Sequence, residues 1–397
     1  MSMQKFFIFL SVFVYVSLGR LNGQQVSKNI LDAEDAVVGA SRLERYLDKL
    51  EGKNVGIIAN QTSVFNNKHL VDTLLTEGVN VIKIFTPEHG FRGTADEGAS
   101  VNNSIDEKTM LPIISLYGNN KKPNESQLQD VDILIFDLQD VGTRFYTYIS
   151  TMTYVMEAAA ENDIPLIVLD RPNPNGFYVD GPVLEDENHS FVGLHQVPVV
   201  YGLTIGEYAM MVNGEYWLSD SLQCDLTVIP MGNYKRNAIY ELPVKPSPNL
   251  PNWESVYLYP SLCFFEGTIV SVGRGTEFPF QIYGHPMMSG DFVFTPRQSE
   301  GRRAPLLCDK ECKGEYLKDY AHNYKRNNNQ INLTWIINAY NQLKDKDDFF
   351  NNFFVKLSGT KKLQQQIEQG MTEDEIRATW SDDLESFKKV REKYLIY

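Results

Sequence analysis

The stretch Val131-Asp-Ile-Leu-Ile-Phe-Asp137 is a short run rich in Ile and Leu that ends where polar and turn-forming residues begin. Three other runs share this character, namely Asn54–Asn60 (NVGIIAN), Asn80–Phe85 (NVIKIF) and Ile164–Asp170 (IPLIVLD). Segments near 68–77 and 145–161 carry helical spacing between the runs. Because the runs are apolar on both faces and alternate with helices, they predict a parallel β-sheet covered by helices on both sides.

Polar residues follow each of these four predicted strands. The four segments are Asn60-Gln61-Thr-Ser, Thr86-Pro-Glu88-His89-Gly, Gln139-Asp140-Val-Gly-Thr-Arg144 and Arg171-Pro-Asn173-Pro-Asn-Gly176. The carboxyl ends of parallel strands meet at one edge of a sheet, and ligands bind there. We therefore expect the four segments to converge on one cleft.

The α/β pattern continues with a helical segment near 204–218 and a strand-like segment at 225–231, and two turn-rich stretches follow at 246–251 and 259–268. We place a domain boundary near 255–265. The organisation predicted is a lead-in at 24–49, an α/β domain at 50–260 and a smaller α+β domain at 261–397. In the second domain, helical patterns at 333–346 and 372–395 are expected, and Thr372-Glu-Asp-Glu375 has the form of a capping box.

Residues 1–23 are typical of a signal peptide, because Lys5 precedes a run of 13 mainly apolar residues that is too short to span a bilayer. The mature protein is expected to be exported. The formal net charge of −14 argues against a nucleic-acid or anionic-membrane partner. Cys308 and Cys312 are candidates for a small-loop disulfide, with free thiols as the alternative.

Glu88 is the first candidate catalytic residue. It follows Pro87 at the mouth of the predicted sheet, where a carboxyl group suits general acid catalysis. The alternatives are that Glu88 caps a neighbouring helix or pairs with Arg92. His89 is expected to be a structural or substrate-contacting group, since the six histidines form no HxH or HExxH pattern and metal-dependent hydrolysis is disfavoured.

Further acids and cations follow later strands and lie near the domain boundary. Arg144 and Arg171 are able to grip a carboxylate bidentately, or else they bridge loop acids. Glu266 and Arg274 lie at the predicted domain junction. No dinucleotide fingerprint, Walker lysine motif or GxSxG elbow is present, so acids, amides, tyrosines and arginines remain as the chemical groups. This set suits a sugar ligand.

Several motifs occur in the order found in one known family. They are GIIANQTS, TPEHGFRG, DLQDVGTRFYTY, LDRPNPNG, DGPVLE, YGLTIGEYA, PSPNLP and FFEGTIVSVGRGTEFPFQ. Together they resemble the exo-β-N-acetylmuramidase (NamZ) family of peptidoglycan glycoside hydrolases, formerly a domain of unknown function, over roughly residues 50–397. The resemblance implies a Rossmann-like N-terminal domain, a smaller C-terminal domain and an active cleft between them.

The resemblance also implies release of N-acetylmuramic acid from the non-reducing ends of peptidoglycan fragments, without a cofactor, with Glu88 as the favoured catalytic residue. Glu266, Asp137 and Asp140 compete for the second catalytic role, and the 2-acetamido oxygen of the substrate is a further alternative. The candidates to bind the lactyl carboxylate are Arg92, Arg144, Arg171 and Arg274. Other expected substrate contacts are Asn60, Gln61, His89, Gln139, Asp140, Tyr146, Asn173 and Asn249. The rival interpretations are a periplasmic muropeptide- or sugar-binding protein without catalysis and an exo-hexosaminidase for another N-acetyl sugar.

Overall fold

A computed structural model describes residues 36–88, 90–92, 103–299, 303–324, 329–343 and 348–397. The predicted signal peptide, residues 24–35 of the predicted lead-in and His89 lie outside the described residues. Among the described residues, no helix has both the length and the apolar character needed to cross a membrane.

Seven strands of the described chain form the main sheet, in the order β5-β6-β4-β1-β7-β8-β9. Their bounds are β1 (Val55–Ala59), β4 (Val81–Thr86), β5 (Ser104–Ile105), β6 (Pro112–Ser115), β7 (Ile133–Asp137), β8 (Leu166–Leu169) and β9 (Leu226–Ile229). β5 pairs antiparallel with β6, and the other neighbours are parallel. The six parallel strands thus have the order 3-2-1-4-5-6 of a Rossmann-like sheet, which confirms the predicted α/β fold.

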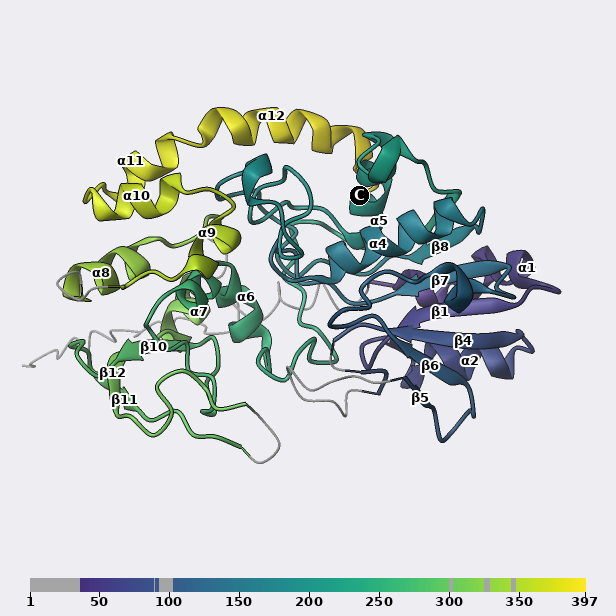
Figure 1. The fold of residues 1–397 in the computed structure, drawn as a ribbon, viewed down its shortest axis with the longest axis horizontal. Coiled ribbons are helices and arrows are strands. Elements are labelled where there is room, and N and C mark those ends of the chain that lie inside the picture. The colour runs from purple at the N-terminus through teal and green to yellow at the C-terminus, as the bar shows by residue number, and fades with distance from the viewer. Residues whose placement is uncertain (1–35, 89, 93–102, 300–302, 325–328, 344–347) are drawn as a thin grey trace, which may run out of the picture.

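Helices cover both faces of this sheet (Figure 1). The helices of this domain are α1 (Leu47–Leu50), α2 (Leu70–Thr76), α3 (Glu125–Leu128), α4 (Tyr148–Glu161) and α5 (Ile205–Gly214), and a short hairpin, β2 (Val64–Phe65) and β3 (Lys68–His69), precedes α2. Ile58 and Phe136 belong to the hydrophobic cluster that includes α4 and α5, whereas Ile57 and Ile135 belong to the cluster that includes α1 and α2. Alternate strand residues therefore supply two separate cores.

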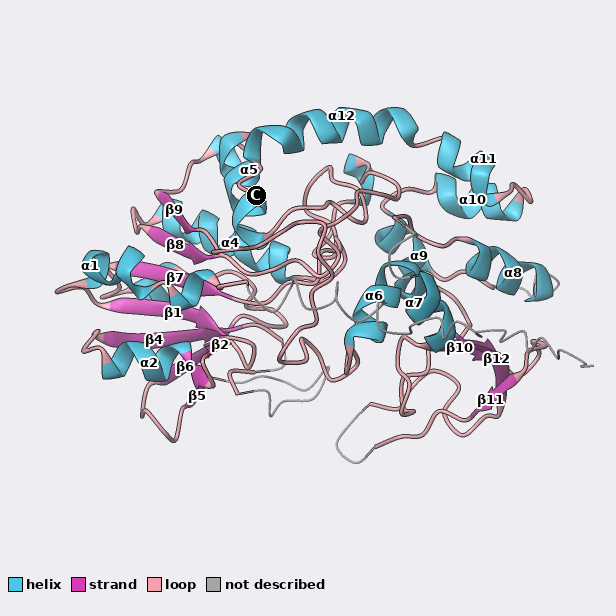
Figure 2. Cartoon of the chain, turned by 180° about the vertical axis from the view of Figure 1, so that it is seen from behind, coloured by secondary structure: helices cyan, strands magenta, loops and turns pink. Residues whose placement is uncertain are grey.

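The C-terminal part contains a small antiparallel sheet and several helices (Figure 2). The strands form the order β10-β12-β11, with bounds β10 (Ile282–His285), β11 (Phe292–Phe294) and β12 (Cys312–Tyr316). The helices are α6 (Trp253–Leu262), α7 (Lys318–Tyr324), α8 (Thr334–Leu343), α9 (Asn352–Ser358), α10 (Lys362–Glu368), α11 (Glu373–Ala378) and α12 (Ser381–Arg391). Cys308 and Cys312 are free thiols.

The helical pattern at 372–395 is divided in the structure. The predicted capping box at Thr372 and Glu375 is present and opens α11, but the chain turns at Trp380 before α12 begins. Trp380 is buried in the large core and takes the N-cap position of α12. Tertiary packing of this ring accounts for the break that the helical spacing did not reveal.

The last residues return to the N-terminal domain and tie the two parts together. Helix α12 runs along one side of the molecule toward α5 (Figure 1). Arg391 donates to the carbonyl oxygen of Gly202 at 2.7 and 3.0 Å. The Tyr397 hydroxyl donates to Asp170 Oδ2 at 2.7 Å and accepts from the Met231 backbone N–H at 2.7 Å. The C-terminus is thus an integral part of the interface between the two parts.

Candidate active site

A cavity of about 630 Å³ lies where residues that follow β4 and β6 meet the C-terminal part of the chain. Glu88 and Tyr117 line it from the N-terminal domain, and Asn249 lines it from the connecting segment. The other lining residues are Pro248, Glu266, Thr268, Val270, Ser271, Val272, Arg274, Gly275, Arg297, Ser299, Arg303, Ala304, Pro305, Leu306 and Asn351. This size is ordinary for a ligand site.

Glu88 projects from the turn after β4 and is half-buried. The pKa of the nearby Tyr148 hydroxyl is raised, mainly because Tyr148 is buried and to a smaller extent because of the Glu88 carboxylate. The alternative pairing with Arg92 is not what the structure shows. Arg92 donates to both carboxylate oxygens of Asp106 at 2.8 Å and to Asp72 at 3.3 Å. These bonds with Arg92 hold the pKa of Asp106 down at about 2.

Glu266 lies in the short 3-10 helix that follows α6, at Cys263–Gly267. Arg274 Nε donates to its Oε1 at 2.6 Å, and the Arg274 guanidinium lies over the Phe280 ring at 5.0 Å. Asn351, on the same cavity wall, donates to the Glu266 carbonyl oxygen at 3.5 Å. Glu266 is therefore a fixed, ion-paired carboxylate that shares the cavity with Glu88.

A buried network supports the segment that carries Asn249. Asn60, directly after β1, donates to the Tyr148 hydroxyl at 2.7 Å. Tyr146 and Gln61 both donate to the carbonyl oxygen of Pro246, at 2.9 and 3.2 Å. These side chains do not line the cavity. They hold the segment three residues before Asn249, so their contribution to the site is positional.

Asp137, Asp140 and Arg171 are buried and do not line the cavity. Asp137 is fully buried, and Arg171 binds both of its oxygens, at 2.5 and 2.9 Å. Asp140 accepts from the Gly142 N–H at 2.7 Å and from the Tyr201 hydroxyl. Burial raises the pKa of Asp140 to about 6. Of the three carboxylates that competed for the second catalytic role, the structure brings only Glu266 into the cavity with Glu88.

The side chains of Gln139 and Asn173 bond to loop carbonyl oxygens and do not line the cavity. Gln139 donates to the carbonyl oxygens of Asp140 and Pro172, at 2.8 and 2.6 Å. Asn173 donates to the carbonyl oxygen of Leu203 at 2.7 Å. A Cβ on Gly142 would lie 2.0 Å from Asn173 Oδ1, which explains why glycine occupies this left-handed position (φ 79°). The motif residues around Asp140 and Asn173 therefore fit one another.

Arg144 lies in the protein interior, away from the cavity. Its side chain is fully buried and donates to four carbonyl oxygens: those of Pro182, Val197, Leu357 and Ser358, at 2.9, 2.7, 3.0 and 2.7 Å. The last two are the final residues of α9, where a cation is favoured by the helix dipole. The expectation that Arg144 grips a substrate carboxylate does not fit this position, and the residue instead fastens α9 to the N-terminal domain.

Sequence reasoning missed Tyr117, Arg297 and Arg303, which all line the cavity. Tyr117 follows β6, a strand that was not recognised because it has only four residues, one of them Pro112. Its place after a strand end was the available signal. Arg297 and Arg303 lie between β11 and β12 in the described stretches 295–299 and 303–305, which have no regular secondary structure, so no spacing pattern marked them.

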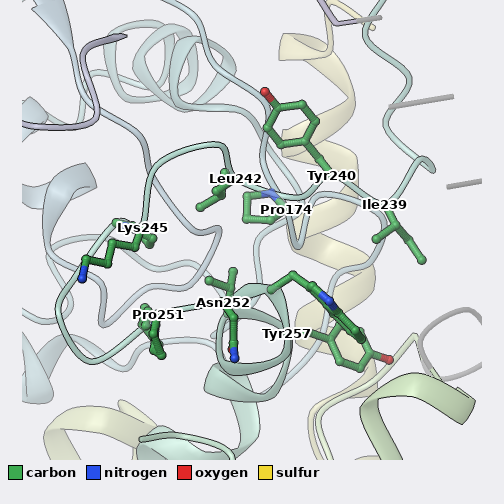
Figure 3. Close-up of a pocket in the computed structure, with 12 residues that line it drawn as sticks. Pro174, Ile239, Tyr240, Leu242, Lys245, Pro251, Asn252 and Tyr257 are labelled. Atoms are coloured by element: carbon green, nitrogen blue, oxygen red, sulfur yellow. The ribbon is translucent and has the colours of Figure 1, made fainter. Parts of the chain in front are cut away.

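A second hollow lies beside this region, among Pro174, Lys245, Pro251, Asn252 and Tyr257 (Figure 3). Its volume is about 30 Å³, which is room for a water molecule and not for a sugar. Asn252 is meanwhile occupied as the N-cap of α6. The larger cavity with Glu88 and Glu266 is therefore the candidate active site.

An α/β part and a smaller part with an antiparallel sheet meet at a cavity that carries two carboxylates and several guanidinium groups, and this arrangement fits a hydrolase of the glycosidase type. The chain belongs to the family of the exo-beta-N-acetylmuramidase NamZ. The N-terminal profile of this family matches residues 55–254, and its C-terminal profile matches residues 257–397. The resemblance in the motifs is thereby confirmed, and so is the prediction of a glycosidase.

Individual relatives agree with this assignment. The chain is 40% identical over 382 residues to the peptidoglycan beta-N-acetylmuramidase NamZ of Bacillus subtilis, a match that covers 89% of each chain. Two crystal structures of DUF1343 family proteins from Bacteroides fragilis share the fold. One is 48% identical with a TM-score of 0.84 and the other 29% identical with a TM-score of 0.77, and both matches cover 91% of this chain and 99% of the other.

Proposed function

We propose that the protein is an exo-acting glycoside hydrolase that releases N-acetylmuramic acid from the non-reducing ends of peptidoglycan fragments. The observation that carries the proposal is the placement of Glu88 and Glu266 in one cavity, on opposite parts of the chain. The family, and the activity in the name of the B. subtilis relative, support the reaction and the sugar.

Glu88 serves as the proton donor to the glycosidic oxygen in this proposal. A general acid must reach the glycosidic oxygen, and Glu88 lines the cavity from the turn that follows β4. Glu266 is ion-paired with Arg274, so it suits the complementary role of a carboxylate that stabilises positive charge at the anomeric carbon or activates a water molecule. If the two carboxyl groups come within about 5–5.5 Å of each other, the second one is placed to attack the anomeric carbon directly. A separation of about 6.5–9.5 Å would leave room for an attacking water molecule between them.

Muramic acid differs from glucosamine by a lactyl carboxylate, which calls for a cation. Of the four arginines considered from the sequence, only Arg274 lines the cavity, and Glu266 neutralises it. Arg297 also lines the cavity, and its partner Asp309 is highly exposed, so this ion pair is weak and exchangeable. Arg297 is therefore the side chain proposed to bind the lactyl carboxylate, and Arg303 is a further cation that lines the same cavity.

We also propose that the protein acts outside the cytoplasm, in a periplasm. The support is the apolar run Phe6–Leu18 after Lys5, which has the form of a signal peptide. The expected result is a secreted or periplasmic mature chain that begins near residue 24, as measured by cell fractionation and N-terminal sequencing. A full-length chain that remains in the cytoplasm would exclude this location.

The reaction is tested with two disaccharides that differ only at the non-reducing sugar. One carries N-acetylmuramic acid and the other N-acetylglucosamine, each β-linked to N-acetylglucosamine. Mass spectrometry should detect free N-acetylmuramic acid from the first and little product from the second. Tight binding of the first without turnover would favour a sugar-binding protein, and faster cleavage of the second would identify an exo-hexosaminidase for another sugar.

A further inference from the structure

Another hollow, distinct from the small one near Asn252, opens beside the catalytic cavity. It has a volume of about 490 Å³, and Pro248, Asn249, Gly275, Arg297 and Ser299 line both spaces. The backbone N–H of Arg297 donates to the carbonyl oxygen of Gly275 at 2.9 Å. This hydrogen bond joins the segment that carries Gly275 to the segment that carries Arg297. A ligand that extends out of the catalytic cavity past these residues enters this neighbouring hollow.

Aromatic and apolar side chains form a large part of the wall of this hollow. We call it the aromatic hollow and define it by Phe278, Pro279, Phe292, Val293 and Phe294. Phe278 and Phe292 each lie about 5 Å from the Tyr316 ring, at 4.9 and 5.1 Å between centroids. Because the rings are fixed by one another and by the small sheet, the apolar wall exists before a ligand arrives.

The charge of the aromatic hollow differs from that of the catalytic cavity. Arg297 stands at the junction of the two spaces, and Glu277 is the other charged side chain of the lining. The remaining polar groups are neutral, and they are Asn249, Thr276, Thr295 and Ser299. Such a wall suits a neutral ligand with an apolar face and a few hydroxyl or amide groups better than an anion.

We propose that the aromatic hollow binds the sugar on the leaving-group side of the scissile bond, a neutral N-acetylhexosamine. The proposal rests on the proposed function, because exo-cleavage leaves the rest of the glycan chain to run out of the catalytic cavity. Apolar faces of sugar rings stack on aromatic side chains, and the amide of an N-acetyl group pairs with neutral polar groups such as Asn249. The volume is within the range of about 300–1,000 Å³ that is usual for ligand sites.

The first test compares two substrates of the full chain. One is the disaccharide N-acetylmuramic acid-β-N-acetylglucosamine, and the other is the β-fluoride of N-acetylmuramic acid, whose leaving group is a single atom that cannot occupy the hollow. Val293→Trp narrows the hollow at a residue that is 52% exposed, and Phe278→Ala removes a ring. Each variant should raise KM for the disaccharide about tenfold, the size of one aromatic contact, and leave the fluoride nearly unchanged.

Met287→Trp is the matched control, because Met287 is 49% exposed in the same part of the chain and lines neither space. Met287→Trp should leave the KM of both substrates unchanged. Equal effects of Val293→Trp on both substrates, or no effect on either, would overturn the proposal. If Phe278→Ala fails to fold, Val293→Trp decides the result alone.

The second test does not depend on catalysis and separates the failure of this proposal from that of the proposed function. If the wild-type protein releases no N-acetylmuramic acid, titration calorimetry still measures the affinity of the aromatic hollow for the neutral disaccharide N,N′-diacetylchitobiose. Binding by the wild type that weakens about tenfold in Val293→Trp supports the neutral-sugar site. Equal binding by both proteins, or no binding by the wild type, overturns it.

Discussion

Replacing Arg144 by methionine tests whether this residue belongs to the scaffold or to the substrate site. Four carbonyl oxygens accept from the buried guanidinium, at 2.7–3.0 Å. A hydrogen bond to a charged group contributes about 1.5–3 kcal/mol to stability, so losing four of them is destabilising. Removing the buried charge offsets part of this loss, because several kcal/mol of desolvation cost disappear with it. Burial indeed lowers the pKa of Arg144 to about 9. The net loss expected for Arg144→Met is about 3–5 kcal/mol of unfolding free energy.

Urea unfolding followed by circular dichroism measures this change, with Arg45→Met as the control because Arg45 is 59% exposed. The control should alter stability by less than about 0.5 kcal/mol. In the fraction of Arg144→Met that remains folded, KM for the muramic disaccharide should be close to the wild-type value. A stability loss below about 1 kcal/mol together with a large rise in KM would refute the assignment and restore Arg144 as a substrate-binding residue.

Three further predictions concern specificity, the C-terminus and pH. Arg297→Gln should raise KM at least about tenfold for the muramic disaccharide in steady-state assays while leaving the weak cleavage of the glucosamine analogue unchanged, and equal effects on both would count against Arg297. Tyr397→Phe should cost about 1–3 kcal/mol in urea unfolding, because the buried Met231 N–H loses its acceptor and Asp170 a donor; a neutral result would mean that the C-terminus is not held as described. Asp140→Asn should flatten the pH dependence of stability. Burial raises the folded-state pKa of Asp140 from 3.8 to about 6, so the wild type loses stability, about 3 kcal/mol at most, as pH rises from about 4 to 6, and an unchanged slope in the variant would contradict this.

The sheet was predictable because its central strands are short apolar runs. Val131–Asp137 and Ile164–Asp170 became β7 and β8 with nearly the predicted bounds. The order of the strands was not readable from these runs, since it depends on which side each crossover helix takes. β6 and the three-stranded sheet were missed, since β12 contains Lys313 and Glu315, which are exposed, and β11 has only three residues.

The site was predictable only in part, and the reason is burial. The four polar segments were expected to converge on one cleft, but of their described residues only Glu88 lines the cavity. The polar side chains that follow β1, β7 and β8 instead bond to other groups of the protein. Asp137 and Arg171 illustrate this, since each is the partner of the other. Glu88 reached the cavity because the turn after β4 carries it beyond the sheet. A motif therefore locates a site more reliably than it separates the residues that touch a ligand from those that support them.

The central claim is that Glu88 donates the proton to the leaving sugar. It is tested most directly by the kcat/KM of Glu88→Gln on two substrates, the muramic disaccharide and the β-fluoride of N-acetylmuramic acid. A sugar leaving group requires protonation and fluoride does not, so the disaccharide rate should fall by about 10²–10⁴ while the fluoride rate falls less than about tenfold. The claim would be contradicted if Glu88→Gln cleaved the disaccharide at the wild-type rate, or if kcat/KM fell equally for both substrates.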